Sequence, residues 1–486
     1  MHGVTLQWPN SGGGRRLGRV TATVLVLFGS TGDLARRMVL PAFFTLAQRG
    51  LLPKEWRLVG NGRGDHPDSE FREAVRSALA ADDDAPDPED LHWDDVADRV
   101  LFAGGGFSAD DPGALPDVLA RIRAELGDDV RLVHYLALPP TVFEPMTAAL
   151  AAHGLTEGAR VVYEKPYGTS PETFEQLDEA VHTVLDEEQV FRIDHFLGKE
   201  ATQDLHVLRF ANQLFAGIWS AEQVAEVQID VPETLDIDDR AEFYDATGAT
   251  LDMLVTHLFQ IAAEVAMEPP ASLSAPDLQR ARESVVAAFR PLDPAEVVLG
   301  QYDGYRDVDG VADDSRTDTF VAARLWIDTD RWRGVPFLLR TGKRMARSAQ
   351  QVTFVLRDVE GPLDGSPPPR GNRVRVSLAG AGGLELGLVV KRPGATVGPP
   401  ELTTGTAHLD LARLPAGDPL PPYATLLREV LAGDRALFTS RDGLRAAWRA
   451  AATLLAHRPA VRPYAPGTWG PDAAADLPAG DWTPVD

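Results

Sequence analysis

The sequence contains no cysteine among its 486 residues. It therefore cannot form a disulfide, offer a thiolate nucleophile, or hold zinc or an iron–sulfur cluster through cysteine. It also lacks an excess of positive charge, because 47 Lys and Arg are set against 72 Asp and Glu, for a net charge of −25. That balance argues against nucleic acid or an anionic membrane as a partner. Any site for an anion must be built locally.

Long apolar runs are missing as well. No window approaches the ~18 to 20 apolar residues of a membrane-spanning helix, so we expect no membrane partner. The glycine-rich leader, residues 1–19, carries three arginines, but no small-residue cleavage pattern follows the apolar run 20–28. We therefore predict a disordered leader, then a buried strand, in a cytoplasmic protein.

The length and the pattern of segments predict two domains. Strands and helices alternate through residues 20–195, which is typical of a doubly wound, Rossmann-like α/β domain. Residues 196–486 are expected to form an α+β domain with a large, mainly antiparallel sheet. Its predicted strands are 224–231, which we expect to be half-buried and antiparallel, 319–327, 351–356 and 373–378. From Arg458 onward, we expect an irregular tail packed on the surface.

A glycine turn follows the first predicted strand and precedes a helical pattern. Gly29 permits a tight turn and Gly32 the close approach of a diphosphate, whose charge the free N–H groups at a helix start attract. The turn is a variant of the dinucleotide fingerprint, and its candidate cofactor-binding residues are Gly29, Ser30, Thr31, Gly32, Asp33 and Leu34. After the second strand, Arg63 occupies a position where an acid would suit NAD; an arginine suits the 2′-phosphate of NADP, although a solvated loop arginine is the alternative.

Residues 190–200 contain the densest group of candidate catalytic and binding side chains. A short strand, 190–193, delivers Asp194, His195 and Lys199 just before a helix predicted over 200–214. Open α/β sheets keep their ligands at the carboxyl ends of strands. We expect His195 and Lys199 to converge on one anion while Asp194 points to a different partner, which suggests a phosphate site beside an acid–base pair.

Two more positions are candidates on weaker patterns. Lys165 follows the strand 160–163 and could reach cofactor and substrate together. The peptide bond between Lys165 and the proline after it can be cis. His257 lies on a predicted helix with largely apolar neighbours, so it is either a core histidine or a partly desolvated general base paired with a carboxylate. The acidic run 233–240 lacks the glycine and final glutamate of an EF-hand, and we predict no metal site.

Seven segments resemble those of glucose-6-phosphate dehydrogenases in their order along the chain and in their residues. They are GSTGDLA at 29–35, YLALPP at 135–140 with VFE at 142–144, EKPYG at 164–168, RIDHFLGKE at 192–200, YDATG at 244–248, AMEP at 266–269 and VPFLLRTGK at 335–343. The likeness spans roughly residues 20–458. It implies a Rossmann domain plus an α+β domain, and a homodimer or homotetramer. It also implies oxidation of glucose 6-phosphate at C1 to 6-phosphoglucono-1,5-lactone with reduction of NADP, the first step of the oxidative pentose phosphate pathway.

The resemblance also implies a role for each matching residue. His257 would remove the C1 hydroxyl proton, and Asp194 would orient its ring and stabilise the imidazolium. The implied substrate-binding residues are His195 and Lys199 for the phosphate, Lys165 between substrate and cofactor, Glu233 and Asp252 for sugar hydroxyls, and Lys343 for charge near the hexose.

Four departures from the family pattern leave alternatives open. Phe196 stands where a tyrosine is usual, Met38 where a lysine is usual, Thr256 where an asparagine is usual, and Ser348 in place of a basic residue, with Arg347 beside it. Loss of charged or buried hydrogen bonds at ~1 to 3 kcal/mol each could shift the choice of substrate. A dehydrogenase of another hexose or hexose phosphate, or a catalytically silent protein that binds NADP or a sugar phosphate, are the alternatives.

Overall fold

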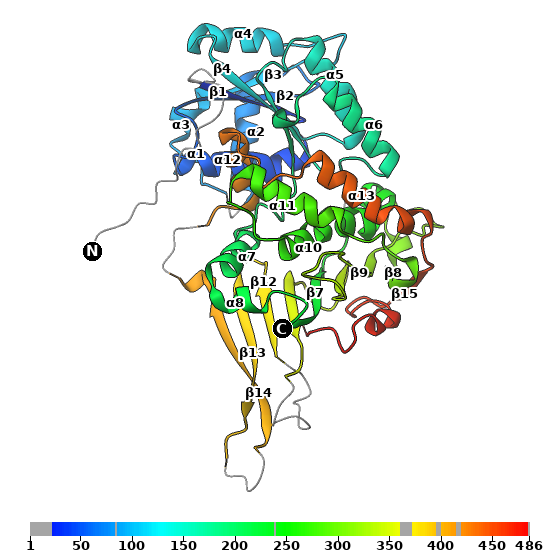
Figure 1. Cartoon of the computed structure of the whole chain (residues 1–486). Helices are drawn as coiled ribbons and strands as arrows, with labels where there is room; N and C mark the ends of the chain where they lie inside the picture. Colours follow the sequence, from blue (N-terminus) through cyan, green and yellow to red (C-terminus); the bar gives the residue numbers. More distant parts are fainter. Residues whose placement is uncertain are drawn as a thin grey trace, which may run out of the picture.

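The computed structural model describes residues 22–82, 85–237, 240–359, 372–394, 400–414 and 419–484, so the predicted leader lies outside the described residues. Two sheets organise the chain (Figure 1), a six-stranded sheet formed by the first part and a nine-stranded sheet formed by the second. No helix of the described residues has the length and apolar character needed to cross a membrane.

The six-stranded sheet has the order β3-β2-β1-β4-β5-β6, and each neighbouring pair is parallel. Its strands are β1 (Ala22–Phe28), β2 (Glu55–Asn61), β3 (Val100–Ala103), β4 (Val130–Leu136), β5 (Arg160–Tyr163) and β6 (Val190–Arg192). This is the strand order of dinucleotide-binding domains, in which the direction of winding reverses between β1 and β4. The prediction of a Rossmann-like domain is confirmed.

Helices cover both faces of this sheet, because successive strand residues point to opposite sides. Val24, Val26 and Phe28 belong to one apolar cluster, whereas Leu25 and Leu27 belong to another. The first cluster is shared with α4 (Leu115–Leu126), α5 (Phe143–Ala152) and α6 (Pro171–His182); the second is shared with α1 (Leu40–Gln48) and α2 (Asp68–Ala80). A short helix, α3 (Trp93–Val96), lies between α2 and β3. Burial on both faces explains the continuous apolar runs of these strands.

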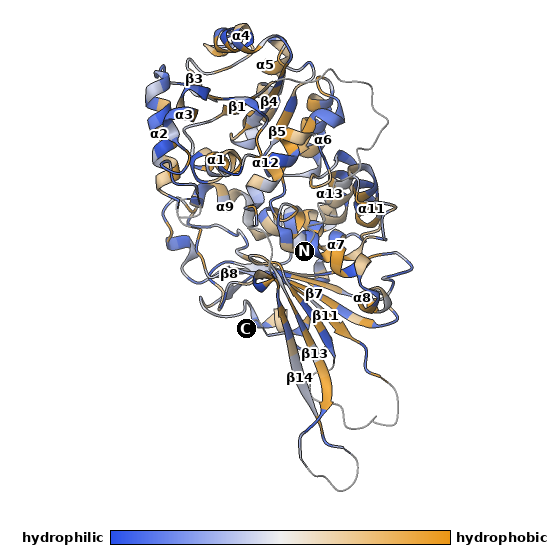
Figure 2. Cartoon of the chain, turned by 90° about the vertical axis from the view of Figure 1, so that its left-hand side faces the viewer, coloured by the Kyte–Doolittle hydropathy of each residue, from blue (hydrophilic) through white to orange (hydrophobic). Residues whose placement is uncertain are grey.

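The nine-stranded sheet has the order β14-β13-β12-β11-β7-β10-β9-β8-β15. Its strands are β7 (Val224–Pro232), β8 (Val297–Tyr302), β9 (Phe320–Leu325), β10 (Phe337–Gly342), β11 (Gln351–Leu356), β12 (Arg373–Ser377), β13 (Gly383–Lys391), β14 (Leu402–Asp410) and β15 (Val461–Tyr464). Only the β7–β10 and β8–β15 pairs are parallel, so the prediction of a mainly antiparallel sheet is confirmed. Figure 2 shows β13 and β14 projecting away from the helices.

One expectation about this sheet was wrong. The strand β7 is buried along almost its whole length, and it pairs in parallel with β10 on one side and antiparallel with β11 on the other. Its polar positions, Glu226, Gln228 and Asp230, face other protein groups instead of water. Asp230, for example, accepts two hydrogen bonds from Arg340. The alternation in sequence therefore marks a polar layer inside the protein.

The helices of the second part begin after the loop 193–199 that follows β6. They are α7 (Glu200–Ala211), α8 (Gln213–Ile218), α9 (Ala241–Ala249), the π-helix η6 (Thr250–Leu258), α10 (Phe259–Ala266), α11 (Ala275–Ala287), α12 (Pro422–Ala432) and α13 (Arg441–Ala456). The single helix predicted over 200–214 is in fact two helices, because Asn212 adopts an extended conformation (φ −122°, ψ 115°) between them.

The C-terminal tail is largely irregular, as we expected, but it is tied to the nine-stranded sheet by one short strand. Its strand β15 pairs with β8, and Tyr464 lies in an apolar cluster with Tyr302 and Phe320. Farther along, Thr483 N donates to Gln228 Oε1 (2.8 Å), so the tail also covers polar groups of β7. Proline and glycine in this segment indicated loops, but long-range strand pairing decided its structure.

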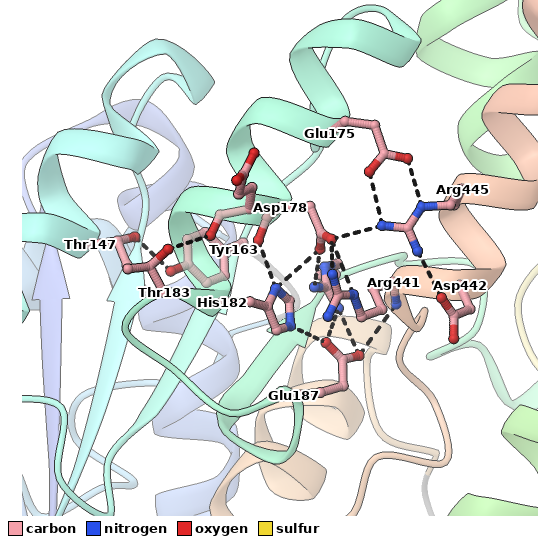
Figure 3. A network of polar contacts seen from close by, with 12 residues as sticks. Thr147, Tyr163, Glu175, Asp178, His182, Thr183, Glu187, Arg441, Asp442 and Arg445 are labelled. Carbon is pink, nitrogen blue, oxygen red and sulfur yellow. Dashed lines mark hydrogen bonds and ion pairs between the residues drawn. The ribbon is translucent and has the colours of Figure 1, made fainter.

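A network of ion pairs joins the two parts of the chain (Figure 3). Asp178 of α6 is buried and accepts hydrogen bonds from Arg192, which ends β6, and from Arg441 and Arg445 of α13. Glu187 accepts two hydrogen bonds from Arg192 as well. The network therefore fixes α13 against the end of β6, two residues before Asp194.

Candidate active site

The centre of the site is a hydrogen bond between two residues that lie 63 positions apart. His257 Nδ1 donates to Asp194 Oδ1 at 2.9 Å, and both side chains are almost fully buried. Asp194 Oδ1 also accepts from the backbone N–H of Phe196 at 2.9 Å, which holds the carboxylate in place. The ring of His257 is thus as buried as a core histidine, yet it is paired with an acid as a general base requires.

Local backbone structure explains how these groups meet. Asp194 follows β6 at the carboxyl edge of the six-stranded sheet, whereas His257 lies on the π-helix η6. Gly198 ends the loop after Asp194, where a Cβ atom would lie 2.7 Å from the carbonyl oxygen of Pro422 and 2.8 Å from Leu426 Cγ. Glycine is therefore required for the loop to pass beneath α12.

The ring nitrogen of His257 that is available for proton transfer is Nε2. It is buried and has no hydrogen-bond partner among the described residues, and the same is true of Asp194 Oδ2. Buried polar atoms are almost always hydrogen-bonded, so a free Nε2 in a ring whose Nδ1 carries the proton is suited to accept a proton from a bound hydroxyl. This arrangement favours a general base.

Histidine and lysine side chains surround the pair. The rings of His195 and His257 lie edge to face, 4.5 Å between centroids, and the ammonium of Lys199 lies 3.8 Å from the ring centroid of Phe196. Each lysine of the site contacts a polar side chain of the protein: Lys165 bonds to Asp252 at 2.7 Å, Lys343 pairs with Glu233, and Lys199 donates to Gln350. An anionic ligand would redistribute these contacts.

The electrostatics follow from burial and from neighbouring charge. Burial lowers the pKa of His195 well below its usual value, and the charges of His257, Lys165 and Lys199 lower it further. Burial also lowers the pKa of Lys199 to about 8, against the opposing charges of Asp194 and Glu233. Burial raises the pKa of Asp252, but the charge and hydrogen bond of Lys165, together with the charges of His257 and Lys343, outweigh it and lower the pKa to about 2. The site therefore keeps Asp252 anionic and makes Lys199 sensitive to pH.

The glycine turn lies at the same edge of the sheet, directly after β1. Gly29 has φ +73°, and a Cβ atom there would lie 2.4 Å from the carbonyl oxygen of Ala137, so only glycine fits. The N–H of Gly32 donates to the carbonyl of Gly29, while Ser30 Oγ donates to the carbonyl of Asn61. Ser30 is thus turned inward, whereas Thr31, Gly32 and Asp33 are exposed and Leu34 is half-buried.

The remaining cofactor candidate and the departures lie as follows. Arg63 is exposed in the loop after β2, and Met38 is 39 % exposed. Thr256 donates to the carbonyl of Leu251, one turn earlier in η6. Ser348 Oγ accepts the N–H of Thr234 at 2.8 Å and therefore holds the segment that carries Glu233, a role that a basic side chain could not fill in the same way.

Three residues of the site were not among the candidates named from the sequence. Gln350 binds Lys199, but it belongs to no motif. Tyr244 is buried, and the centroid of its ring lies 5.7 Å from the ammonium of Lys343. Glu164 is also buried, and its Oε1 accepts a hydrogen bond of 2.5 Å from the hydroxyl of Tyr135. Tyr244 and Glu164 stand inside two of the segments that resemble the family, so the motifs could have indicated them.

One alternative for the centre is a divalent metal. The ligand atoms of Asp194, His195 and His257 all lie within 4.8 Å of one another, and two histidines with one carboxylate are a common set of metal ligands. The hydrogen bond from His257 Nδ1 to Asp194 uses two of these atoms for each other, which favours an acid–base pair. A chelator test distinguishes the two.

Comparison with known proteins decides the family. Residues 26–204 match the model described as "Glucose-6-phosphate dehydrogenase, NAD binding domain", and residues 206–483 match "Glucose-6-phosphate dehydrogenase, C-terminal domain". The chain belongs to the glucose-6-phosphate dehydrogenase family. Its resemblance to this family, expected from seven segments, is confirmed.

Relatives and solved structures of the family align over nearly the whole chain. Glucose-6-phosphate 1-dehydrogenase of Mycolicibacterium smegmatis is 38% identical over 93% of this chain and 95% of its own, and glucose-6-phosphate 1-dehydrogenase 1 of Mycobacterium tuberculosis is 35% identical over 93% and 94%. The crystal structure of the Mycobacterium avium enzyme superposes with a TM-score of 0.84 at 35% identity, covering 95% of this chain and 99% of that one. The structure of a glucose-6-phosphate dehydrogenase in complex with its substrate glucose-6-phosphate superposes with a TM-score of 0.86 at 27% sequence identity. It covers 96% of this chain and 98% of that one.

Proposed function

We propose that this member of the family oxidises glucose 6-phosphate at C1 to 6-phosphoglucono-1,5-lactone and transfers the hydride to NADP. The observation that carries the proposal is the bond from His257 Nδ1 to Asp194, which leaves a buried Nε2 free to accept a proton. The solved relative that holds glucose 6-phosphate has the same fold over 96% of this chain, which supports the choice of substrate.

The residues of this chain would divide the work between proton removal and positioning. His257 Nε2 takes the proton of the C1 hydroxyl, and the carboxylate of Asp194 stabilises the imidazolium that forms. Lys199 and His195 hold the phosphate and so fix the distance from the sugar ring to His257. Glu233 and Asp252 accept hydrogens from sugar hydroxyls, while Lys165 and Lys343, now paired with these acids, add positive charge on either side.

The cofactor would lie at the turn after β1. The close approach of Gly29 to Ala137 and the exposed backbone at Thr31 and Gly32 fit a diphosphate, and the exposed guanidinium of Arg63 suits the 2′-phosphate that distinguishes NADP from NAD. Lys165 would face both ligands. When bound, NADP supplies the nicotinamide that accepts the hydride.

We extend the proposal to the organisation of the protein. Residues 20–195 would form the cofactor domain and residues 196–486 the substrate and assembly domain, which the division of the strands between two sheets supports. We expect a homodimer or homotetramer in the cytoplasm; a relative from Arabidopsis thaliana, 34% identical, is named a cytoplasmic form.

The test is an assay of the purified protein with NADP or NAD against a panel of hexoses and hexose phosphates, followed by the absorbance of reduced nicotinamide. Turnover of glucose 6-phosphate with NADP, unaffected by a chelator, is expected. Turnover of a different sugar alone would assign the site to that sugar, and Phe196 and Ser348 would then account for the change. Cofactor binding without any turnover would refute the proposal, as would loss of activity on removal of metal.

A further inference from the structure

A cavity beside the nine-stranded sheet lies outside the candidate active site. It has a volume of about 750 Å³ and is lined by the end of β8, the turn 303–307, Arg316 and the segment 458–463. A cavity of this size is within the range that holds small-molecule ligands, and it is much larger than one phosphate requires. Its floor includes the buried rings of Tyr302 and Tyr305, whose hydroxyls donate to Asp236 and Asp245.

The charge of this cavity is opposite to that of the protein. The lining contains four arginines and two aspartates, a local charge of +2 in a chain whose net charge is −25; they are Arg306, Arg316, Arg458, Arg462, Asp303 and Asp307. The side chains of Arg316 and Arg462 are exposed and make no hydrogen bond or ion pair with any of the described residues, and the side chain of Arg306 donates only to Gln301 Oε1. Cations that face a hollow and lack a carboxylate partner are suited to an anionic ligand.

Two unpaired arginines on separate segments suit two phosphoryl groups. A guanidinium binds a phosphate through two parallel N–H donors, and Arg316 and Arg462 enter the cavity from a loop and from β15. Asp303 and Asp307 are able to accept hydroxyl or amino hydrogens from the rest of such a molecule. The chemistry therefore matches a compound that carries a diphosphate next to a polar group.

A chain of contacts leads from this cavity to the catalytic helix. Arg458 donates to the buried carboxylate of Asp318, which in turn accepts the backbone N–H of Thr250 at 2.7 Å and its hydroxyl at 2.6 Å. Thr250 is the first residue of η6, the helix that carries Asp252 and His257. A phosphate beside Arg458 would compete with Asp318 for its guanidinium.

We propose that this cavity is a ligand site for a small molecule that carries a diphosphate, and that Arg458 and Asp318 connect it to the helix of Asp252 and His257. Binding draws Arg458 toward the ligand, leaves Asp318 without its counter-charge and loosens the first turn of η6. This site is separate from the glycine turn and from the sugar site, and it gives the protein a means of responding to a phosphorylated metabolite.

Binding is tested by calorimetric titration of the full-length protein with inorganic pyrophosphate and, separately, with ADP. The double variant Arg316→Ala, Arg462→Ala should bind pyrophosphate at least about tenfold more weakly, because each lost guanidinium removes charge-assisted hydrogen bonds. Replacement of Arg413, an exposed arginine in the short helical turn after β14, by alanine is the control, and Arg63→Ala tests for binding at the cofactor turn. Tighter binding of ADP than of pyrophosphate would mean that the nucleoside also contributes. Equal affinity in wild type and double variant, or loss of affinity in Arg63→Ala alone, would overturn the proposal.

The proposed connection from the cavity to η6 is tested by measuring the backbone hydrogen exchange of residues 250–258. Exchange there should become faster when pyrophosphate is bound to the wild type and should remain unchanged in the double variant at the same concentration. Circular dichroism of each variant checks that the fold is kept. Binding in the cavity without any change of exchange in 250–258 would refute the connection through Arg458 and Asp318.

Discussion

Replacement of Asp194 by asparagine tests how much the charge of this side chain contributes to catalysis. The substitution keeps the shape of the side chain, and the N–H of Phe196 can still donate to its oxygen. The amide cannot stabilise an imidazolium as a carboxylate does. If its NH₂ group turns toward His257, it donates to Nδ1 and shifts the proton of the ring to Nε2, the atom that must be free to act as a base.

The size of the effect follows from the geometry. With 2.9 Å between Nδ1 and Oδ1, the centres of the two charges lie about 4 Å apart, and at an effective dielectric constant of about 20 their attraction is ~4 kcal/mol. Loss of that attraction in the transition state lowers kcat by about 10³-fold. KM for glucose 6-phosphate should stay within about threefold of wild type, because Lys199 and His195, which we assign to the phosphate, are unchanged.

The assay is the initial rate of nicotinamide reduction at saturating NADP, with glucose 6-phosphate varied. Asp252→Asn is the matched control, since it also removes a buried carboxylate of the site, but one that pairs with Lys165 instead of His257. The control should raise KM more than it lowers kcat. If Asp194→Asn is folded, binds NADP and keeps kcat within tenfold of the wild type, His257 does not work with Asp194 in the way described.

Four further predictions address the substrate, pH and stability. Phe196→Tyr should lower KM for glucose 6-phosphate by up to about tenfold by restoring a hydroxyl near Lys199, and an unchanged KM would mean that the phosphate lies elsewhere. Because the pKa of Lys199 is about 8, its positive charge is lost as pH rises through 8, so KM should rise above that pH; a flat KM from pH 7 to 9.5 would contradict this. Gly198→Ala should cost ~1 to 3 kcal/mol of unfolding free energy in urea, since its Cβ meets α12, whereas Gly480→Ala, with open space around it and no positive φ, tests the cost of a glycine replacement alone. Asp178→Asn should cost ~3 to 5 kcal/mol, because Arg192, Arg441 and Arg445 each lose a charged partner in a buried network; a thermal midpoint equal to that of the wild type would refute the importance of that network.

Features governed by local sequence were predictable. The strands β1, β5 and β6 follow from apolar runs, and the turn at Gly29 follows from glycine geometry. The segment around Asp194 was identified as the centre because it concentrates acid, base and lysine after a strand. Its partner His257 could be assigned only by resemblance, since apolar neighbours fit a core histidine equally well.

Features governed by long-range contacts were not predictable in this way. The polar alternation of β7 does not reveal that its polar face meets Arg340 and the tail. The loops of the tail hide the pairing of β15 with β8, and nothing near Gln350 indicates that it binds Lys199. In each of these cases the partner lies more than a hundred residues away, so it is topology, and not local pattern, that decides the contact.

The position of α12 has a consequence for synthesis on the ribosome. Ala424, Leu426, Leu427 and Val430 of this helix complete the apolar cluster of the first sheet, which otherwise draws on residues before 198 and on Leu437 and Phe438. The last strand of that sheet is translated more than two hundred residues earlier, which amounts to roughly 10 to 40 s at ~5 to 20 residues per second. During that interval the nascent chain exposes an unfinished apolar face, so its first domain cannot mature until nearly the whole polypeptide has emerged.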